Sequence, residues 1–266
     1  MITGKDFNKI LLAFFFICLF FICQGVGGFA TVFLNFLGLS LDKTMSVALA
    51  LANILGISFF GFYCLVARPA DLTWKTTFRG VGDARLCRRS LLSLLLAPPL
   101  IFLVNWLMEI LPSLPDWVGE QNLEGLMRQP LGLLVVSVVG PVCEELLFRG
   151  GVQRSLHRAF SPKVSICCAA LLFGFAHLNP AQIPAAFILG LLLGFAYWWT
   201  GSLIAPICIH ILNNSLACAI GLLSPDDDSI VHLVGGTTNA GIIVLVCLFL
   251  LYILWRAVQK ESFQEV

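Results

Sequence analysis

The sequence predicts an all-α fold, a polytopic transmembrane helical bundle with about eight spans. Hydrophobic residues make up 59% of the 266-residue chain, and its mean hydropathy is +0.93. Charged residues make up only 12%, about half of what is usual in a soluble domain. The apolar residues also fall in runs of the length, roughly 20 residues, that a helix needs to cross the hydrocarbon core.

The apolar runs place the whole chain, residues 1–266, in a single integral membrane domain. The predicted spans are residues 10–37, 44–67, 90–112, 131–148, 164–178, 182–200, 203–223 and 239–256. The first is either one long tilted helix or a helix that breaks at the glycine-rich stretch 25–28. A net charge of +1 provides no basic face, so we expect no nucleic-acid partner.

Lysine and arginine are distributed unevenly between the two sides of the predicted bundle. Eight spans place two of them, Lys43 and Arg128, on one side and thirteen on the other. The thirteen are Lys5, Lys9, Arg68, Lys75, Arg79, Arg85, Arg88, Arg89, Arg154, Arg158, Lys163, Arg256 and Lys260. Because cytoplasmic loops carry the excess of basic residues, both termini are expected in the cytoplasm. In a bacterial host the protein is expected in the inner membrane.

Ionisable residues inside a span point to a function, because each costs about 2.5–3.5 kcal/mol on insertion scales. In this chain they belong to three motifs, one each in predicted spans four, five and seven. The motifs are Glu144-Glu145-x-x-x-Arg149-Gly150, Phe173-x-x-x-His177 and His210-x-x-x-Asn214. We therefore expect two carboxylates, a guanidinium, two imidazoles and a carboxamide to meet inside the bundle.

Helical geometry predicts different roles for the two glutamates. Glu145 and Arg149 are four residues apart, so they share a helix face in the order that favours an ion pair. Glu144 is rotated about 100° away from that face and has no cation on its own face. We interpret Glu145 and Arg149 as a supporting ion pair and Glu144 as the general base.

Each histidine shares a helix face with the other end of its motif, His177 with Phe173 and His210 with Asn214. A neutral imidazole can hold or polarise a water, and an asparagine amide can donate to a developing oxyanion. Together with Glu144, these groups suffice for the attack of water on an amide. The predicted catalytic residues are therefore Glu144, His177, His210 and Asn214.

Taken together and in this order, the motifs resemble those of the CPBP family. This family comprises CAAX-processing proteases of the Rce1 type and the bacterial abortive-infection or bacteriocin-processing proteins. The resemblance covers about residues 130–220, the expected catalytic core. It implies an intramembrane endopeptidase with Glu144 as the catalytic glutamate and Glu145 and Arg149 as the second glutamate and the arginine. His177 then corresponds to the first histidine, and His210 and Asn214 to the second histidine and the asparagine.

Three alternatives to a metal-free peptidase stay open. One is a zinc enzyme with Glu144, His177 and His210 as ligands, a donor set that suits catalytic zinc. We favour no cofactor, because the additional asparagine is an unusual zinc ligand and is better explained as an oxyanion donor. A second alternative is a non-proteolytic membrane scaffold or bacteriocin immunity protein, and a third is a transporter with proton-relay carboxylates. The chain shows no sign of the two matching halves of a transporter.

The sequence also predicts the partners of the site and the route to it. We expect membrane lipids and a membrane-associated protein or peptide as partners, with a prenylated CAAX-type protein as one substrate that the resemblance implies. Gly150 and Gly151 follow Glu144 on the predicted cytoplasmic side, where small residues are expected to open a water path. Arg154 and Arg158 are expected to face an anionic lipid surface or a substrate carboxylate.

Overall fold

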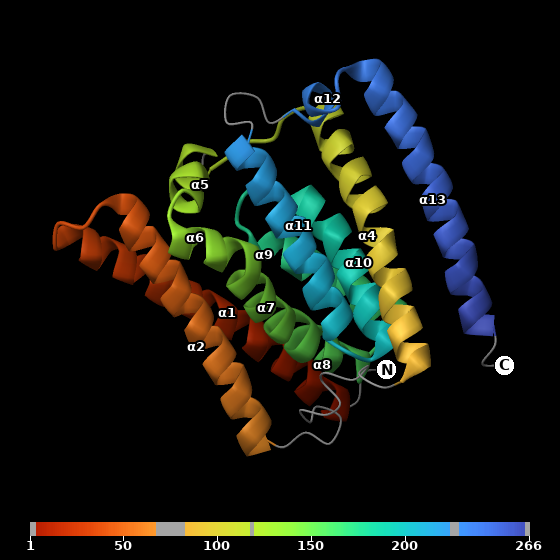
Figure 1. Ribbon diagram of the computed structural model, residues 1–266. Coiled ribbons are helices and arrows are strands. Elements are labelled where there is room, and N and C mark those ends of the chain that lie inside the picture. Colours follow the sequence, from red (N-terminus) through yellow and green to blue (C-terminus); the bar gives the residue numbers. More distant parts are fainter. Residues whose placement is uncertain (1–3, 68–82, 118–119, 224–228, 264–266) are drawn as a thin grey trace.

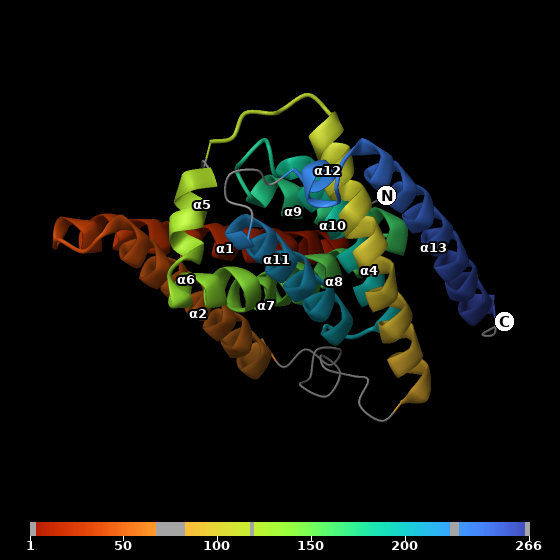
Figure 2. The ribbon, with the colours of Figure 1, turned by 45° about the horizontal axis from the view of Figure 1, so that its top comes forward.

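The computed structural model describes residues 4–67, 83–117, 120–223 and 229–263, and every regular element in these ranges is a helix. The all-α class is therefore confirmed. Figures 1 and 2 show α1 and α2 as a pair whose connecting turn projects away from the other helices. Three basic residues used to predict the orientation, Arg68, Lys75 and Arg79, lie outside the described residues.

Seven of the described helical segments are long and apolar enough to cross a membrane, and an eighth apolar helix, α9, is shorter. The first three helices are α1 (Gly4–Phe36), α2 (Leu41–Ala67) and α4 (Ala84–Ile110). The central run comprises α5 (Glu120–Met127), α6 (Pro130–Leu134), η1 (Val135–Val139), α7 (Gly140–Glu145), η2 (Leu146–Gln153) and α8 (Arg154–His157). The last five are α9 (Pro162–Ala176), α10 (Ile183–Thr200), α11 (Ile204–Leu223), α12 (Ile230–Leu233) and α13 (Thr237–Phe263). The prediction of about eight spans agrees with this count.

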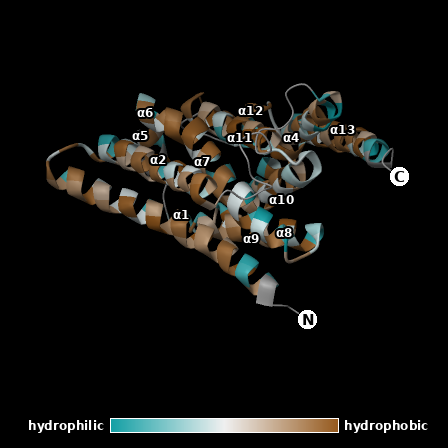
Figure 3. Cartoon of the chain, turned by 90° about the horizontal axis from the view of Figure 1, so that it is seen from below, coloured by the Kyte–Doolittle hydropathy of each residue, from teal (hydrophilic) through white to brown (hydrophobic). Residues whose placement is uncertain are grey.

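The outer helices present apolar side chains on their surfaces. The helix α1 is continuous through the stretch 25–28, and Phe29 and Phe36 near its end are 73% and 85% exposed. Only 11% of the apolar window of α13 is buried. Figure 3 shows both helices coloured mostly as hydrophobic along their length. Because lipid replaces water around such surfaces, this exposure fits an integral membrane protein.

The helix that carries both glutamates is the central element. It runs without interruption from Pro130 to His157, nine residues beyond the end predicted for span four. Two parts of it, η1 and η2, are π-helical. The π-helix is rare in proteins, and where it occurs it is frequently at a functional site. This composite helix packs against α1, α2, α9, α10 and α11. The glutamates are thus surrounded by helices from most of the chain.

The predicted opening at Gly150 and Gly151 is wrong. Both glycines are buried in η2, Gly150 beneath the ring of Phe60 and Gly151 beneath the ring of Phe16. Their role is to let α2 and α1 approach η2 closely, because a side chain would occupy the same space as these rings. Arg154, expected at a lipid surface, is also buried, with 4% exposure. Its position within the extended helix, rather than in a loop, explains the difference.

Replacing Gly151→Ala is expected to destabilise the protein by about 1–3 kcal/mol, the usual cost of overpacking a core. A Cβ at this position would lie 2.5 Å from Cγ of Phe16, whose side chain is fully buried and has no room to retreat. Thermal unfolding of the purified protein in detergent measures the effect. The matched control is Gly28→Ala in α1, where a Cβ meets no atom within 4 Å. Equal melting temperatures for the two variants would contradict the close approach.

Candidate active site

The second glutamate of the predicted pair forms the centre of a buried polar cluster. Oε1 of Glu145 accepts hydrogen bonds from Nη1 of Arg149 at 2.7 Å and from Nδ1 of His210 at 2.9 Å. Glu145 and Arg149 are fully buried, and the side chain of His210 is 3% exposed. The ion pair expected from the four-residue spacing is thus present, and it also binds the histidine of α11.

Arg149 connects this cluster to α10 and α9. Its Nη2 donates to the carbonyl of Gly190 at 3.1 Å, and its Cζ lies 4.5 Å from the centroid of the Phe173 ring. A Cβ on Gly190 would meet Ala170 at 3.1 Å, so the glycine lets α10 approach closely enough for this bond. The guanidinium therefore holds three helices together through a carboxylate, a carbonyl and an aromatic face.

Glu144 lies beside the same histidine and is more accessible than Glu145. Its Oε2 is 3.8 Å from Nε2 of His210, which is too long for a direct hydrogen bond. The side chain of Glu144 is 20% exposed, yet Oε2 is buried and has no hydrogen-bond partner among the described atoms. His210 thus stands between the two glutamates. Its Nδ1–H is committed to Glu145, which leaves the Nε2 lone pair facing Glu144.

His177 reaches the cluster through the ring of Phe173. It caps the C-terminus of α9, where its Nδ1–H donates to the carbonyl of Phe173 at 3.0 Å. The Phe173 ring packs edge-to-face against both histidines, with centroids 5.0 Å from His177 and 5.6 Å from His210. The F-x-x-x-H spacing therefore has a direct structural meaning, because the phenylalanine fixes the ring of its own histidine and touches the other one.

Asn214 contacts the composite helix about two turns before the glutamates. Its Nδ2 donates to the carbonyl of Val136 in η1 at 3.0 Å, and its Oδ1 accepts from Nδ2 of Asn213 at 3.1 Å. The sequence placed Asn214 with His210 on one helix face, and both side chains do point to the composite helix. One hydrogen of the Asn214 amide is used by Val136, and the second remains to donate.

The zinc alternative requires Glu144, His177 and His210 to converge on one point. Among residues 4–67, 83–117, 120–223 and 229–263, no group of three or more His, Cys, Asp or Glu side chains is arranged to hold a metal ion. Glu144 and His210 are close to each other, and the bond from Nδ1 of His210 to Glu145 leaves Nε2 on the side of Glu144. In their described positions, Glu144, His177 and His210 are therefore not gathered into a three-ligand site.

Three residues near the site were not identified from the sequence. Asn179, which is 1% exposed, donates to Oδ1 of Asp116 at 2.8 Å and thereby fastens the segment after α4 to the turn that follows His177. Leu178 within that turn has φ = 52°, a left-handed conformation that is uncommon for a leucine. Gln153 is fully buried and donates to the carbonyl of Gly194 at 2.8 Å. Gln153 was detectable in principle, because it lies four residues after Arg149.

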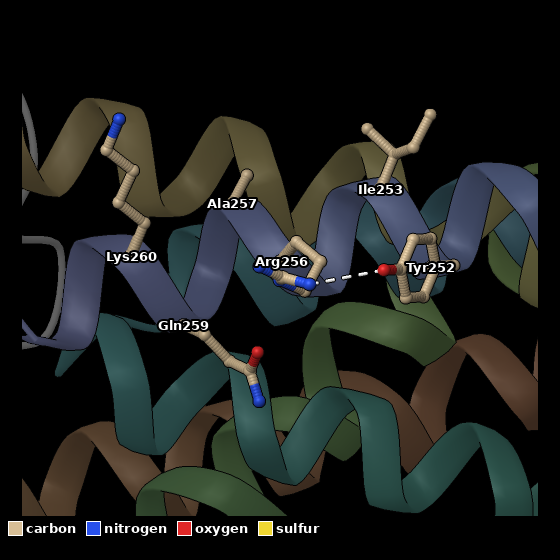
Figure 4. Close-up of a pocket in the computed structure, with 6 residues that line it drawn as sticks. All are labelled: Tyr252, Ile253, Arg256, Ala257, Gln259 and Lys260. Atoms are coloured by element: carbon tan, nitrogen blue, oxygen red, sulfur yellow. Dashed lines mark hydrogen bonds between the residues drawn. The ribbon is translucent and has the colours of Figure 1, made fainter.

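A surface pocket lies away from these residues. Figure 4 shows it on α13, where Nη1 of Arg256 donates to the hydroxyl of Tyr252 at 3.1 Å. Its lining residues are Tyr252, Ile253, Arg256, Ala257, Gln259 and Lys260. All six belong to one helix that contributes nothing to the cluster around Glu145. We therefore place the candidate active site at the glutamates and not at this pocket.

Comparison with known proteins connects this geometry to a family. Residues 127–216 match the family model described as type II CAAX prenyl endopeptidase Rce1-like. The chain is 32% identical over 103 residues to the membrane-embedded CAAX protease MroQ of Staphylococcus aureus (strain USA300), which is 36% of this chain and 42% of that protein. It is 25% identical over 100 residues to YdiL of Bacillus subtilis (strain 168), which is 38% of this chain and 41% of that protein.

The matched segment contains all six predicted site residues, from Glu144 to Asn214. The resemblance seen in the three motifs is thus confirmed for this segment. The chain spans about two fifths of the length of the two curated relatives described above. No solved structure matches the chain.

Proposed function

We propose, from the match of residues 127–216 to CAAX-type endopeptidases, that this protein is an intramembrane endopeptidase. Its substrate would be a membrane-associated protein or peptide, with a prenylated CAAX-type protein as one candidate. The observation that carries the proposal is the position of His210, which is bonded to Glu145 and lies 3.8 Å from the more accessible Glu144. That arrangement leaves one carboxylate oxygen and one imidazole nitrogen free to share a water.

In the proposed mechanism Glu144 is the general base. It takes a proton from a water near Oε2, and the resulting hydroxide attacks the peptide carbonyl carbon. The tetrahedral intermediate then breaks its C–N bond, and the proton held by Glu144 passes to the departing amine. The Glu145–Arg149 pair keeps His210 in the tautomer whose Nε2 accepts a hydrogen bond, which orients the same water.

The negative charge on the tetrahedral intermediate requires donors. The second amide hydrogen of Asn214 is one candidate, because the first is fixed by Val136 and so holds the amide in place. His177 has a different role. Its Nδ1–H donates to the Phe173 carbonyl, which leaves the lone pair of Nε2 to accept a hydrogen bond from the water or the substrate. Both side chains are half-buried, as expected for groups that must contact an incoming peptide.

Peptidase activity tests the proposal directly. The purified protein in lipid vesicles is incubated with a membrane-tethered peptide, with and without a chelator, and the products are identified by mass spectrometry. Cleavage that persists in the chelator supports the glutamate mechanism, whereas cleavage that stops and returns with Zn²⁺ supports the zinc alternative. Absence of cleavage for a panel of tethered peptides would favour the non-proteolytic scaffold.

The proposed orientation, with both termini in the cytoplasm, has its own expected result. Cys87 is exposed in the first turn of α4, among basic residues. In a protein that retains only this cysteine, a membrane-impermeant thiol reagent should label it from the cytoplasmic side alone. The control is Lys43→Cys in a cysteine-free background, because Lys43 is exposed at the start of α2 and is predicted on the opposite side. Labelling of both from one side would overturn the topology.

A further inference from the structure

Polar side chains follow one stripe of the composite helix from the candidate active site to its end at His157. Glu145, Arg149, Gln153 and His157 are spaced by four residues, and the first three are fully buried. One amide hydrogen of Gln153 goes to the Gly194 carbonyl, and Nε2 of Gln153 lies 3.1 Å from Nε2 of His157. Such a row of polar groups in a packed core is costly unless each group has a partner.

Each member of the stripe has an atom without a partner. Among the described residues, buried atoms that lack a hydrogen bond include Oε2 of Glu145, Nε of Arg149, Oε1 of Gln153 and Nδ1 of His157. Nearly all buried polar atoms in native proteins are bonded to protein or to ordered water. Other such atoms occur among the described residues, but these four lie on consecutive turns along one side of one helix, so a single explanation can account for all four.

Along the helix, the four atoms alternate between hydrogen-bond acceptors and donors, an order that suits a row of water molecules. The nitrogen of Arg149 donates and the oxygens of Glu145 and Gln153 accept, while Nδ1 of His157 carries the hydrogen because Nε2 accepts from Gln153. Successive members of the stripe lie about one helical turn apart, a distance comparable to the span of two hydrogen bonds of about 2.8 Å to one bridging oxygen.

We propose that Glu145, Arg149, Gln153 and His157 line a file of ordered waters that leads from the His157 end of the composite helix to the candidate active site. The role of this file rests on the proposed function: it supplies the one water molecule that each peptide hydrolysis consumes. The route differs from an opening at Gly150 and Gly151, because it runs along the opposite, polar side of η2. The fixed charge of Arg149 suits the passage of water and opposes the passage of protons.

The glycines of α10 take part in this arrangement. A Cβ on Gly194 would lie 2.8 Å from Oε1 of Gln153, so a larger residue would occupy the space beside that oxygen. The carbonyl of Gly194 accepts a hydrogen bond from Gln153, and one turn earlier the carbonyl of Gly190 accepts one from Arg149. The G-x-x-x-G sequence at residues 190–194 thus provides both close packing and two carbonyl partners for the stripe.

Radiolytic labelling tests the water file independently of peptidase activity. X-ray pulses convert bound water into hydroxyl radicals, which oxidise adjacent side chains. Mass spectrometry then identifies the oxidised residues. The reporter is Phe173, which is 1% exposed and lies against Arg149, and the dry control is Phe16, which is fully buried against Gly151 on the other side of η2. We expect Phe173 to be oxidised well above Phe16 in the wild-type protein. Equal, low oxidation of both would overturn the proposal.

A substitution tests whether the water that oxidises Phe173 is bound by the polar stripe. Gln153→Met keeps the side-chain length but removes both the donor and the acceptor, so oxidation of Phe173 should fall several-fold. The matched control is Ser155→Ala, because Ser155 is equally buried but its hydroxyl is bonded to the carbonyl of Gly151, off the stripe. Unchanged oxidation of Phe173 in Gln153→Met would overturn the route. Gly194→Ala, whose Cβ would lie 2.8 Å from Oε1 of Gln153, is a second variant for which we expect the same loss of oxidation.

Kinetics separate this inference from the proposed function. In Gln153→Met we expect kcat to fall about tenfold with an unchanged KM, because water supply and not peptide binding is affected. A raised KM with an unchanged kcat would overturn the supply role. A wild-type protein that cleaves no peptide, but whose Phe173 oxidation falls in Gln153→Met, would remove the proposed peptidase function while supporting the water file.

Discussion

Glu144→Gln is expected to lower peptide turnover by at least about 100-fold, the lower range for loss of a general base. The amide has nearly the shape of the carboxylate but does not accept the proton of the attacking water. Because the side chain of Glu144 is 20% exposed and its Oε2 makes no hydrogen bond to a described atom, we expect the fold to depend little on its charge. Turnover of a tethered peptide and thermal unfolding, measured on the same preparation, check both parts of this expectation.

Glu144→Asp serves as the companion variant. It keeps a carboxylate but withdraws it by one methylene from His210, so we expect a residual activity between those of the wild type and Glu144→Gln. The melting temperatures of both variants should stay close to that of the wild type. Near-normal turnover in Glu144→Gln would remove the base role, and a large loss of stability would show that Glu144 is mainly structural.

Glu145→Gln is expected to destabilise the fold by about 3–5 kcal/mol, because it leaves the buried charge of Arg149 without its counter-charge. The same oxygen also binds His210, and in the variant it becomes a neutral amide oxygen, so the bond that fixes the tautomer of the histidine is weakened. Activity should therefore fall together with stability, in contrast to Glu144→Gln. Thermal unfolding in detergent and turnover at a temperature below the transition measure the two effects.

The chain provides a matched control for this pair. Glu124 and Arg128 are also four residues apart and 2.6 Å from each other, but their side chains are 34% and 63% exposed. Glu124→Gln should change the stability by only about 0.3–0.5 kcal/mol, the usual contribution of an exposed helix pair. If Glu145→Gln had as small an effect as Glu124→Gln, the buried ion pair would not hold the site together.

Much of the fold could be predicted because hydropathy alone determines membrane spans. Helices must satisfy their backbone polar groups internally in lipid, so long apolar runs leave little choice of structure. The end of the fourth span was placed too early, at residue 148, because Arg149, Gln153 and Arg154 have the composition of a loop. In the structure these side chains are buried and Arg149 and Gln153 bond to carbonyls of α10, a tertiary effect that no local pattern reveals.

The polar cluster was predictable in its members and less so in its contacts. The four-residue spacing correctly indicated that Glu145 faces Arg149. Spacing within one helix does not determine which residue of another helix lies opposite. The contact of His210 with Glu145 and the central position of Phe173 therefore emerged only from the packing of α9 and α11 against the composite helix. The glycines at 150 and 151 were misinterpreted because small residues serve flexibility and close packing equally well.

The short helix α9 makes bilayer thickness relevant to this protein. Its 15 residues extend about 22 Å, whereas the hydrocarbon core is about 30 Å thick. Val164, Leu171 and Phe175 are exposed along it, so we expect lipid to contact this face. The resulting hydrophobic mismatch costs fractions of a kcal/mol per Å and is relieved where acyl chains are shorter. Since His177 caps this helix, we expect the thickness of the surrounding membrane to act on the depth of this candidate catalytic side chain.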